Sequence, residues 1–300
     1  MSLVSLVKIP KSNEHPMGQA IRQALNLIDY AFDRSVRKVV IKPNLCYYFD
    51  CTTGQTTEPQ FVSELIDVLR EEISGDVDVA VVESDASAMR CKYAFRMLGF
   101  EKLASEKNVR LVNLSLDESQ RVDATCNGKN YSFLVPKTIR DADLRINIAK
   151  IKYTVDPIKL TCALKNIYGC NPYPKKYTYH SDLGNVIVAL NKAMKFNLCL
   201  IDNKIASGIQ PRRLDLVMAS RDPVAIDFAA AKIAGLNPYR IAYLALAERE
   251  GVGKRAYIPR GESLEFFRAL YPKPTFKIKA KTRARQLLVG VGLGGRLGLE

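Results

Sequence analysis

Short apolar runs alternate with longer segments of helical spacing along most of the chain. The apolar runs are rich in valine and isoleucine and predict buried strands, which lie at 36–44, 77–84, 109–114, 144–152, 196–203 and 214–220. The segments between them predict helices at 61–73, 86–106, 160–169, 183–194 and 222–235. Strands separated by helices of this length are typical of βαβ units. We therefore expect an α/β fold, a mainly parallel sheet flanked by helices, in one lobe or two.

Local signals mark the ends of some of these elements. An Asn-Gly pair at 127–128 predicts an antiparallel hairpin over 120–135, because both residues tolerate the positive φ of a tight turn. Thr57, with Gln60 three residues later, predicts an N-cap and capping box for the helix that follows. Asp222 stands directly before a proline and predicts the N-cap of the helix that starts there.

Composition is that of a folded protein with a strong positive charge. Apolar residues make up 47% of the chain, and 45 lysines and arginines face 31 carboxylates, for a net charge of +14. The expected partner is therefore anionic: a carboxylated or phosphorylated small molecule, nucleic acid or a lipid surface. Part of the excess lies in a glycine-rich segment, 271–300, with seven bases and one acid. We expect a single α/β domain over 1–270 and a basic tail suited to nucleic acid or anionic lipid.

The cellular location is predicted from the targeting and membrane-spanning signals that the sequence lacks. No apolar run is long enough to span a bilayer, and the first residues do not read as a secretory signal. Seven scattered cysteines without a C-x-x-C pair favour reduced thiols over a disulfide framework. These features favour a cytoplasmic protein.

Polar residues gather where the predicted strands end, the edge at which open α/β sheets bind ligands. Lysine and asparagine side chains there, and in the lysine-rich segment 141–180, can hold a carboxylate or phosphate through charge-assisted hydrogen bonds. The candidate binding residues are Lys42, Asn44, Glu83, Asn147, Lys152, Lys165 and Asn166. The candidates for moving a proton are His180, Asp202 and Lys150.

The cysteines offer a second interpretation. Cys46 and Cys51 flank one predicted loop, and Cys162 and Cys170 flank another, so four thiolates are available for an iron–sulfur cluster or zinc. Their spacings match no standard motif, and buried inert thiols are the simpler explanation, because free cysteine is readily buried. The sequence has no G-x-G-x-x-G after the first predicted strand and no G-x-x-x-x-G-K-[ST], so the standard nucleotide loops are disfavoured.

Several short motifs occur in an order that resembles one family. They are KPN at 42–44, ES at 83–84, INIAKIK at 146–152, LTCALKNIYG at 160–169, His180, LIDN at 200–203 and DPVAID at 222–227. Together they resemble the domain-of-unknown-function 362 family. The resemblance implies an α/β fold distantly similar to the N-terminal, nucleophile-bearing half of lactate racemases. It also implies association with iron–sulfur proteins, because many members carry a ferredoxin-like module, which is not visible in this sequence.

The chain departs from the family pattern at two positions. Tyr153 follows Lys152 where the family has a histidine near its lysine pair, and Cys162 replaces a glycine.

Three hypotheses stay open: an enzyme that binds a small anion, with isomerase or racemase chemistry; an iron–sulfur redox protein; and a binder of nucleic acid or anionic membrane.

Overall fold

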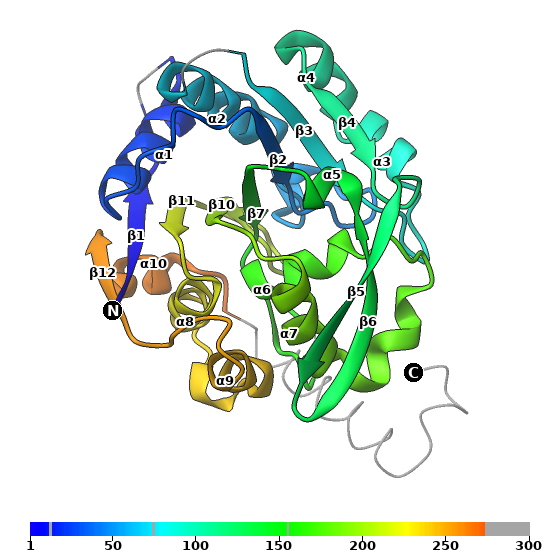
Figure 1. Cartoon of the computed structure of the whole chain (residues 1–300). Helices are drawn as coiled ribbons and strands as arrows, with labels where there is room; N and C mark the ends of the chain where they lie inside the picture. Colours follow the sequence, from blue (N-terminus) through cyan, green and yellow to red (C-terminus); the bar gives the residue numbers. More distant parts are fainter. Residues whose placement is uncertain (12–13, 74–75, 155, 274–300) are drawn as a thin grey trace.

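The fold is built on one large twisted sheet whose strands run mostly in one direction (Figure 1). The computed structural model describes residues 1–11, 14–73, 76–154 and 156–273, and within them this sheet has the order β12-β1-β11-β10-β7-β2-β3-β4. Five neighbouring strands are mutually parallel: β2 (Lys38–Lys42), β3 (Asp78–Glu83), β4 (Arg110–Asn113), β7 (Leu144–Ala149) and β10 (Leu198–Ala206). The predicted α/β fold with a mainly parallel sheet is confirmed.

One strand inside the sheet runs against its neighbours. β11 (Arg212–Ser220) pairs antiparallel with both β10 and β1 (Ser2–Lys8), and β1 pairs in parallel with β12 (Tyr257–Gly261). The apolar pattern predicts neither β1 nor β12, so this part of the sheet is a finding of the structure. The apolar run of β1 is interrupted by Ser5, and both of its partners come from the last third of the chain.

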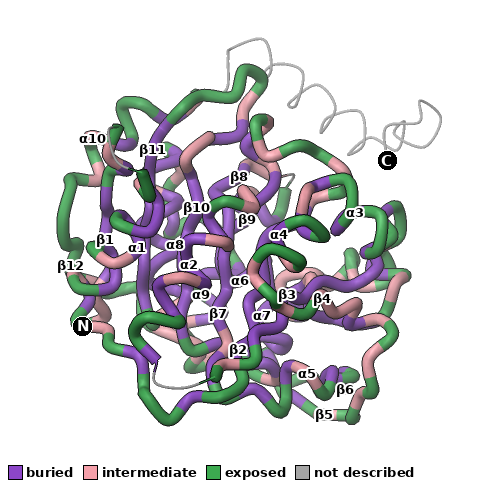
Figure 2. Tube along the Cα trace, turned by 90° about the horizontal axis from the view of Figure 1, so that it is seen from above, coloured by how far each residue is buried: buried purple, intermediate pink, exposed green. Residues whose placement is uncertain are grey.

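Helices cover both faces of the sheet, and each face has its own apolar core (Figure 1). Successive strand residues point to opposite faces, so Val40 belongs to one core and Ile41 to the other. One face carries α1 (Pro16–Asn26), α2 (Pro59–Glu72), α3 (Cys91–Met97) and α4 (Phe100–Lys107). The other carries α5 (Lys137–Arg140), α6 (Ala163–Asn166), α7 (Leu183–Ala193), α8 (Pro223–Ile233), α9 (Ala242–Arg249) and α10 (Leu264–Leu270). Burial on both faces explains why the parallel strands appear as continuous apolar runs (Figure 2).

The predicted hairpin is confirmed. β5 (Ser119–Cys126) and β6 (Lys129–Pro136) pair antiparallel and are joined by two residues with positive φ, Asn127 at 52° and Gly128 at 73°. A second small pair, β8 (Lys152–Tyr153) and β9 (Leu160–Thr161), follows β7.

Three local predictions need correction. Thr57 does not cap α2: Glu58 is the N-cap residue, and the Thr57 hydroxyl instead accepts a hydrogen bond from the Asn44 amide. The predicted helix 86–106 starts later, at Cys91, and its expected interruption at Gly99 divides it into two helices, with Gly99 at φ 82° between them. The predicted helix 160–169 is divided among β9, α6 and the 3-10 turn η2 (Ile167–Cys170).

Two other expectations concern the cap of α8 and the end of the chain. The Asp222 carboxylate accepts from the backbone amides of Val224 and Ala225, at 2.9 and 3.0 Å, so it is the predicted N-cap. Most of the predicted basic tail, residues 274–300, lies outside the described residues. Within the described part of the chain, no helix has the length and apolar character needed to cross a membrane.

Candidate functional site

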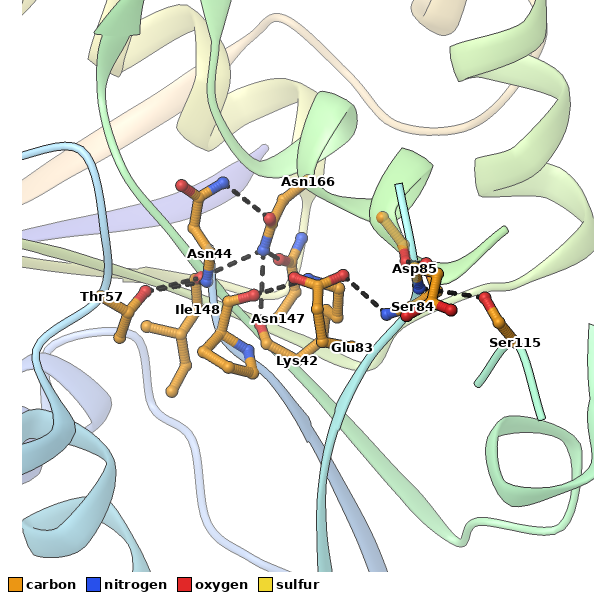
Figure 3. Close-up of polar contacts among 12 residues, drawn as sticks. Lys42, Asn44, Thr57, Glu83, Ser84, Asp85, Ser115, Asn147, Ile148 and Asn166 are labelled. Carbon is orange, nitrogen blue, oxygen red and sulfur yellow. Dashed lines mark hydrogen bonds and ion pairs between the residues drawn. The ribbon is translucent and has the colours of Figure 1, made fainter. Parts of the chain in front are cut away.

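The candidate site lies at the carboxyl ends of β2, β3, β7 and β10 (Figure 3). The chain leaves β2 toward β3 and β4 on one side, whereas β7 and β10 lie on the other side of β2. The connections that follow β7 and β2 therefore leave in opposite directions. In sheets of this kind, the usual ligand position is between the carboxyl ends of two such strands. Lys42 ends β2, Glu83 ends β3, and Lys150 directly follows β7.

Three buried asparagines join this edge to α6 (Figure 3). Asn44 donates from Nδ2 to Oδ1 of Asn166 (2.8 Å), and Asn166 donates to Oδ1 of Asn147 (2.7 Å). Asn166 also donates to the carbonyl of Ile148 (3.1 Å), and Asn147 to that of Ala163 (2.9 Å). A buried network with its donors in use holds its members in one arrangement. These amides therefore act first as a scaffold that fixes the β2 loop, β7 and α6.

A buried carboxylate that the sequence interpretation missed holds α6 in place. Asp227, on α8, accepts from the backbone amides of Ala163 (2.7 Å) and Leu164 (3.1 Å) at the start of α6. It is fully buried, and burial raises its pKa to about 7. The alanine-rich surroundings of Asp227, AIDFAAA, indicate a helix buried on all sides, and this signal could have found it.

Three lysines form what we term the lysine cluster: Lys150, Lys152 and Lys165. Lys152 is almost fully buried, and its Nζ donates to Oδ1 of Asn44 (2.7 Å) and to the carbonyl of Gln55 (2.9 Å). Lys150 lies 3.5 Å from a carboxylate oxygen of Asp202. Lys165 is half-buried and has no hydrogen bond or ion pair with any residue that the structure describes.

Burial dominates the electrostatics of the lysine cluster. The pKa of Lys152 is lowered to about 8, mainly by burial; the nearby Cys46 thiol opposes this shift, and the positive charges of Lys165 and Lys150 add to it. Burial likewise lowers the pKa of Lys165. An amine that titrates near neutral pH can both bind an anion and carry a proton.

The carboxylates around the lysine cluster do not balance it. Asp202 is fully buried and accepts from the backbone amides of Glu58 (2.8 Å) and Lys204 (3.3 Å). Glu58 pairs with Lys204 at 2.7 Å, and burial raises the pKa of Glu58. Counting Lys204, four ammonium groups thus stand against two carboxylates in this part of the described structure.

The neighbouring strand ends carry a matched pair instead. The Nζ of Lys42 lies 2.8 Å from Oε2 of Glu83 and donates to the carbonyl of Pro43 (2.6 Å), and both side chains are buried (Figure 3). Gly169 covers the pair so closely that a Cβ there would lie 2.9 Å from Cε of Lys42. Lys176, also missed as a site residue, donates to the Ser84 hydroxyl, and burial lowers its pKa to about 8.

His180 makes no polar contact with the lysine cluster among the described residues. It is exposed on the 3-10 turn η3 (Lys176–Asp182), and within the described ranges no hydrogen bond or ion pair joins it to Lys150, Lys152 or Lys165. Asp202 and Lys150, the other two candidates for proton transfer, do lie together.

The four cysteines do not form one ligand set. Cys46 and Cys51 are half-buried in the loop after β2, whereas Cys162 and Cys170 are fully buried. Cys46 lies beside Lys152, Cys162 hydrogen-bonds with Asp227, and Cys170 is close to Lys42. Over the residues described, no group of three or more histidine, cysteine or carboxylate side chains is placed to hold a metal ion. The structure therefore gives no support to a cluster bound by these thiols.

Three comparisons relate the chain to known proteins. A family model described as "Domain of unknown function (DUF362)" matches residues 39–232. A thylakoid-associated protein of Synechocystis sp. is 32% identical over 133 residues, which are 40% of this chain and 41% of that protein, so the match spans less than half of the relative. The lactate racemase apoprotein of Thermoanaerobacterium thermosaccharolyticum is similar with a TM-score of 0.46 and 9% identity, over 79% of this chain and 58% of the racemase.

Proposed function

The chain belongs to the DUF362 family, and from the geometry of its own site we propose that it binds a small carboxylated or phosphorylated molecule at the lysine cluster. The observation that carries the proposal is the unbalanced charge at the carboxyl edge of the sheet, where four ammonium groups meet two carboxylates. Buried charge without a partner is costly. A bound anion offsets that cost, and Lys165 is the ammonium best placed to meet it, because among the described residues it has no hydrogen bond or ion pair and only the electrostatic effect of Cys46 favours its charged form.

The contacts of Lys152 support proton transfer as the chemistry. A neutral amine has two N–H groups and one lone pair, and Lys152 has two strong acceptors, on Asn44 and Gln55, with the Cys46 thiol beside it. In its neutral form Lys152 can accept a proton from a carbon next to the carbonyl or carboxylate of the bound molecule. The electron pair left on that carbon moves onto the carbonyl or carboxylate oxygen, where Lys150 and Lys165 stabilise the negative charge. Return of the proton to either face of the carbon gives an isomerase or racemase reaction.

Binding is tested by titrating the protein with inorganic phosphate and with pyruvate in a calorimeter. We expect the Lys165→Met variant to lose at least tenfold in affinity, because charge-assisted hydrogen bonds are worth about 1.5–3 kcal/mol. Lys107→Met is the matched control, since Lys107 forms a partly exposed pair with Asp67. A folded Lys165→Met protein with unchanged affinity, or a wild-type protein that binds neither anion, contradicts the proposal.

The chemistry has its own test, the exchange of pyruvate methyl protons in deuterated water, followed by nuclear magnetic resonance. We expect catalysed exchange in the wild type and its loss in Lys152→Met. Phosphate binding without exchange would retain the binding function and reject proton transfer by Lys152.

A further inference from the structure

A cavity of about 250 Å³ lies on the face of the sheet that carries α6, α7 and α8. Its walls come from the end of α7, the start of β10, the start of α8 and the loop after α9. We term it the α7–α9 cleft. None of the three lysines of the lysine cluster lines it.

Basic side chains dominate the charge of the α7–α9 cleft. Lys192 pairs with Glu250 at 2.9 Å, so these two charges cancel. Lys195 and Arg221 also line the cleft, and neither forms an ion pair in the part of the chain that the structure describes. The Arg221 guanidinium lies 5.7 Å from the ring of Tyr30, which carries no opposite charge, and the side chains of Lys195 and Arg221 are both exposed at the mouth of the cleft. The cleft therefore has a net positive charge.

The remaining walls favour an organic molecule over a bare inorganic ion. Phe196, Val252 and Pro223 contribute apolar surface. A volume of about 250 Å³ is below the range of about 300–1,000 Å³ usual for sites of drug-sized ligands, so it suits a smaller molecule. We propose that the α7–α9 cleft is a second binding site, for a small organic anion with one phosphate or carboxylate group and a short apolar body.

The cleft and the lysine cluster lie on either side of the same short helix. Asn147 and Asn191 line the cleft, and their amides donate to the carbonyls of Ala163 and Leu164 in α6, both at 2.9 Å. α6 carries Lys165, and Asn147 also accepts from Asn166. A ligand that moves either asparagine therefore shifts α6, and the two sites influence each other's affinity reciprocally. This coupling rests on the proposed function, whereas the cleft site does not.

The absence of tryptophan from the chain provides a direct test. A Phe196→Trp variant places a single fluorescent reporter in the cleft, and Tyr239→Trp, at a position that is 64% exposed, is the matched control. With phenyl phosphate as the probe, we expect a saturable fluorescence change in Phe196→Trp and none in Tyr239→Trp. Adding Lys195→Ala and Arg221→Ala to the reporter should raise the midpoint at least tenfold, because both cations are removed.

Each outcome distinguishes the two sites. The cleft proposal is overturned if phenyl phosphate causes no saturable fluorescence change in Phe196→Trp. It is also overturned if the midpoint of that change stays the same when Lys195 and Arg221 are replaced. Both results count whether or not the lysine cluster binds an anion. If circular dichroism finds Phe196→Trp unfolded, calorimetry on otherwise wild-type protein replaces it. Loss of Lys195 and Arg221 should then remove one equivalent of bound phenyl phosphate, and unchanged stoichiometry overturns the proposal. A cleft that binds while Lys165→Met leaves phosphate affinity unchanged rejects the proposed function alone.

Discussion

Lys42 and Lys152 lie at the same edge of the sheet and are both almost completely buried, yet their partners differ. Lys42 is 1% exposed and pairs with the Glu83 carboxylate, under the cover of Gly169. Lys152 is 6% exposed, and its acceptors are the neutral oxygens of Asn44 and Gln55.

We interpret this difference as one between a lysine buried for stability, Lys42, and a lysine buried where the proposed ligand binds, Lys152. In a buried ion pair with good geometry, the two charges neutralise each other. A buried ammonium group held only by neutral groups keeps a positive potential around it, which attracts an anionic ligand. Under the proposed function, lysines at neighbouring strand ends would thus have two roles, one structural and one in binding. Three substitutions test this distinction.

The largest effect is expected from breaking the matched pair. In Lys42→Met the Glu83 carboxylate stays buried with its nearest cation removed, and such a loss costs about 3–5 kcal/mol. Chemical denaturation measures the free energy of unfolding, with Lys107→Met as a control that should lose no more than about 1 kcal/mol. Equal losses in the two variants would contradict a structural role for the pair of Lys42 with Glu83.

A smaller loss of stability is expected from crowding the pair. The Cβ of Gly169→Ala would lie 2.9 Å from Cε of Lys42 and 3.0 Å from Oε1 of Glu83, and overpacking of this kind costs about 1–3 kcal/mol. Gly128→Ala is a control for steric crowding, because nothing lies within 4 Å of the added Cβ. It does not control for backbone strain, because the φ of Gly128 is positive. Anion affinity should change little in Gly169→Ala. A tenfold fall in affinity would mean that the matched pair also belongs to the binding site.

The smallest effect, taken per pH unit, is a pH dependence that follows from the lowered pKa of Lys152. The pKa of Lys152 is about 8 in the folded protein against 10.5 for a free lysine, so the unfolded chain binds more protons between these values. The free energy of unfolding of the wild type, relative to Lys152→Met, should therefore rise with pH from about 8 to 10.5, by no more than about 1.4 kcal/mol per pH unit. Over the same range the wild type should bind phosphate more weakly as Lys152 loses its charge. A flat difference between the two proteins would show that Lys152 is not perturbed.

The sequence predicts the fold better than it predicts the pairing at the site. Strands such as β2 and β3 are continuous apolar runs because both faces are covered, and their polar ends identify the ligand edge from local pattern alone. That Glu83 neutralises Lys42 while Lys152 meets Asn44 depends on which strand ends become neighbours in space, and local pattern contains no such information. The predicted helix 160–169 is wrong for a similar reason, since Asp227, more than 60 residues later, captures the first amides of α6.

The position of β1 has a consequence for how the protein is made. The first strand of the chain, Ser2–Lys8, pairs only with β11 and β12 in the described sheet, with Ser5 opposite Ala219 and Ser2 opposite Tyr257. On the ribosome this segment is made before its partners, which are synthesised more than 200 residues later. Contacts this distant in sequence form slowly, and an unpaired apolar strand is prone to aggregation in the interval. The five parallel strands can assemble once residue 206 has left the exit tunnel, so β1 is translated before them and completes its pairing after them.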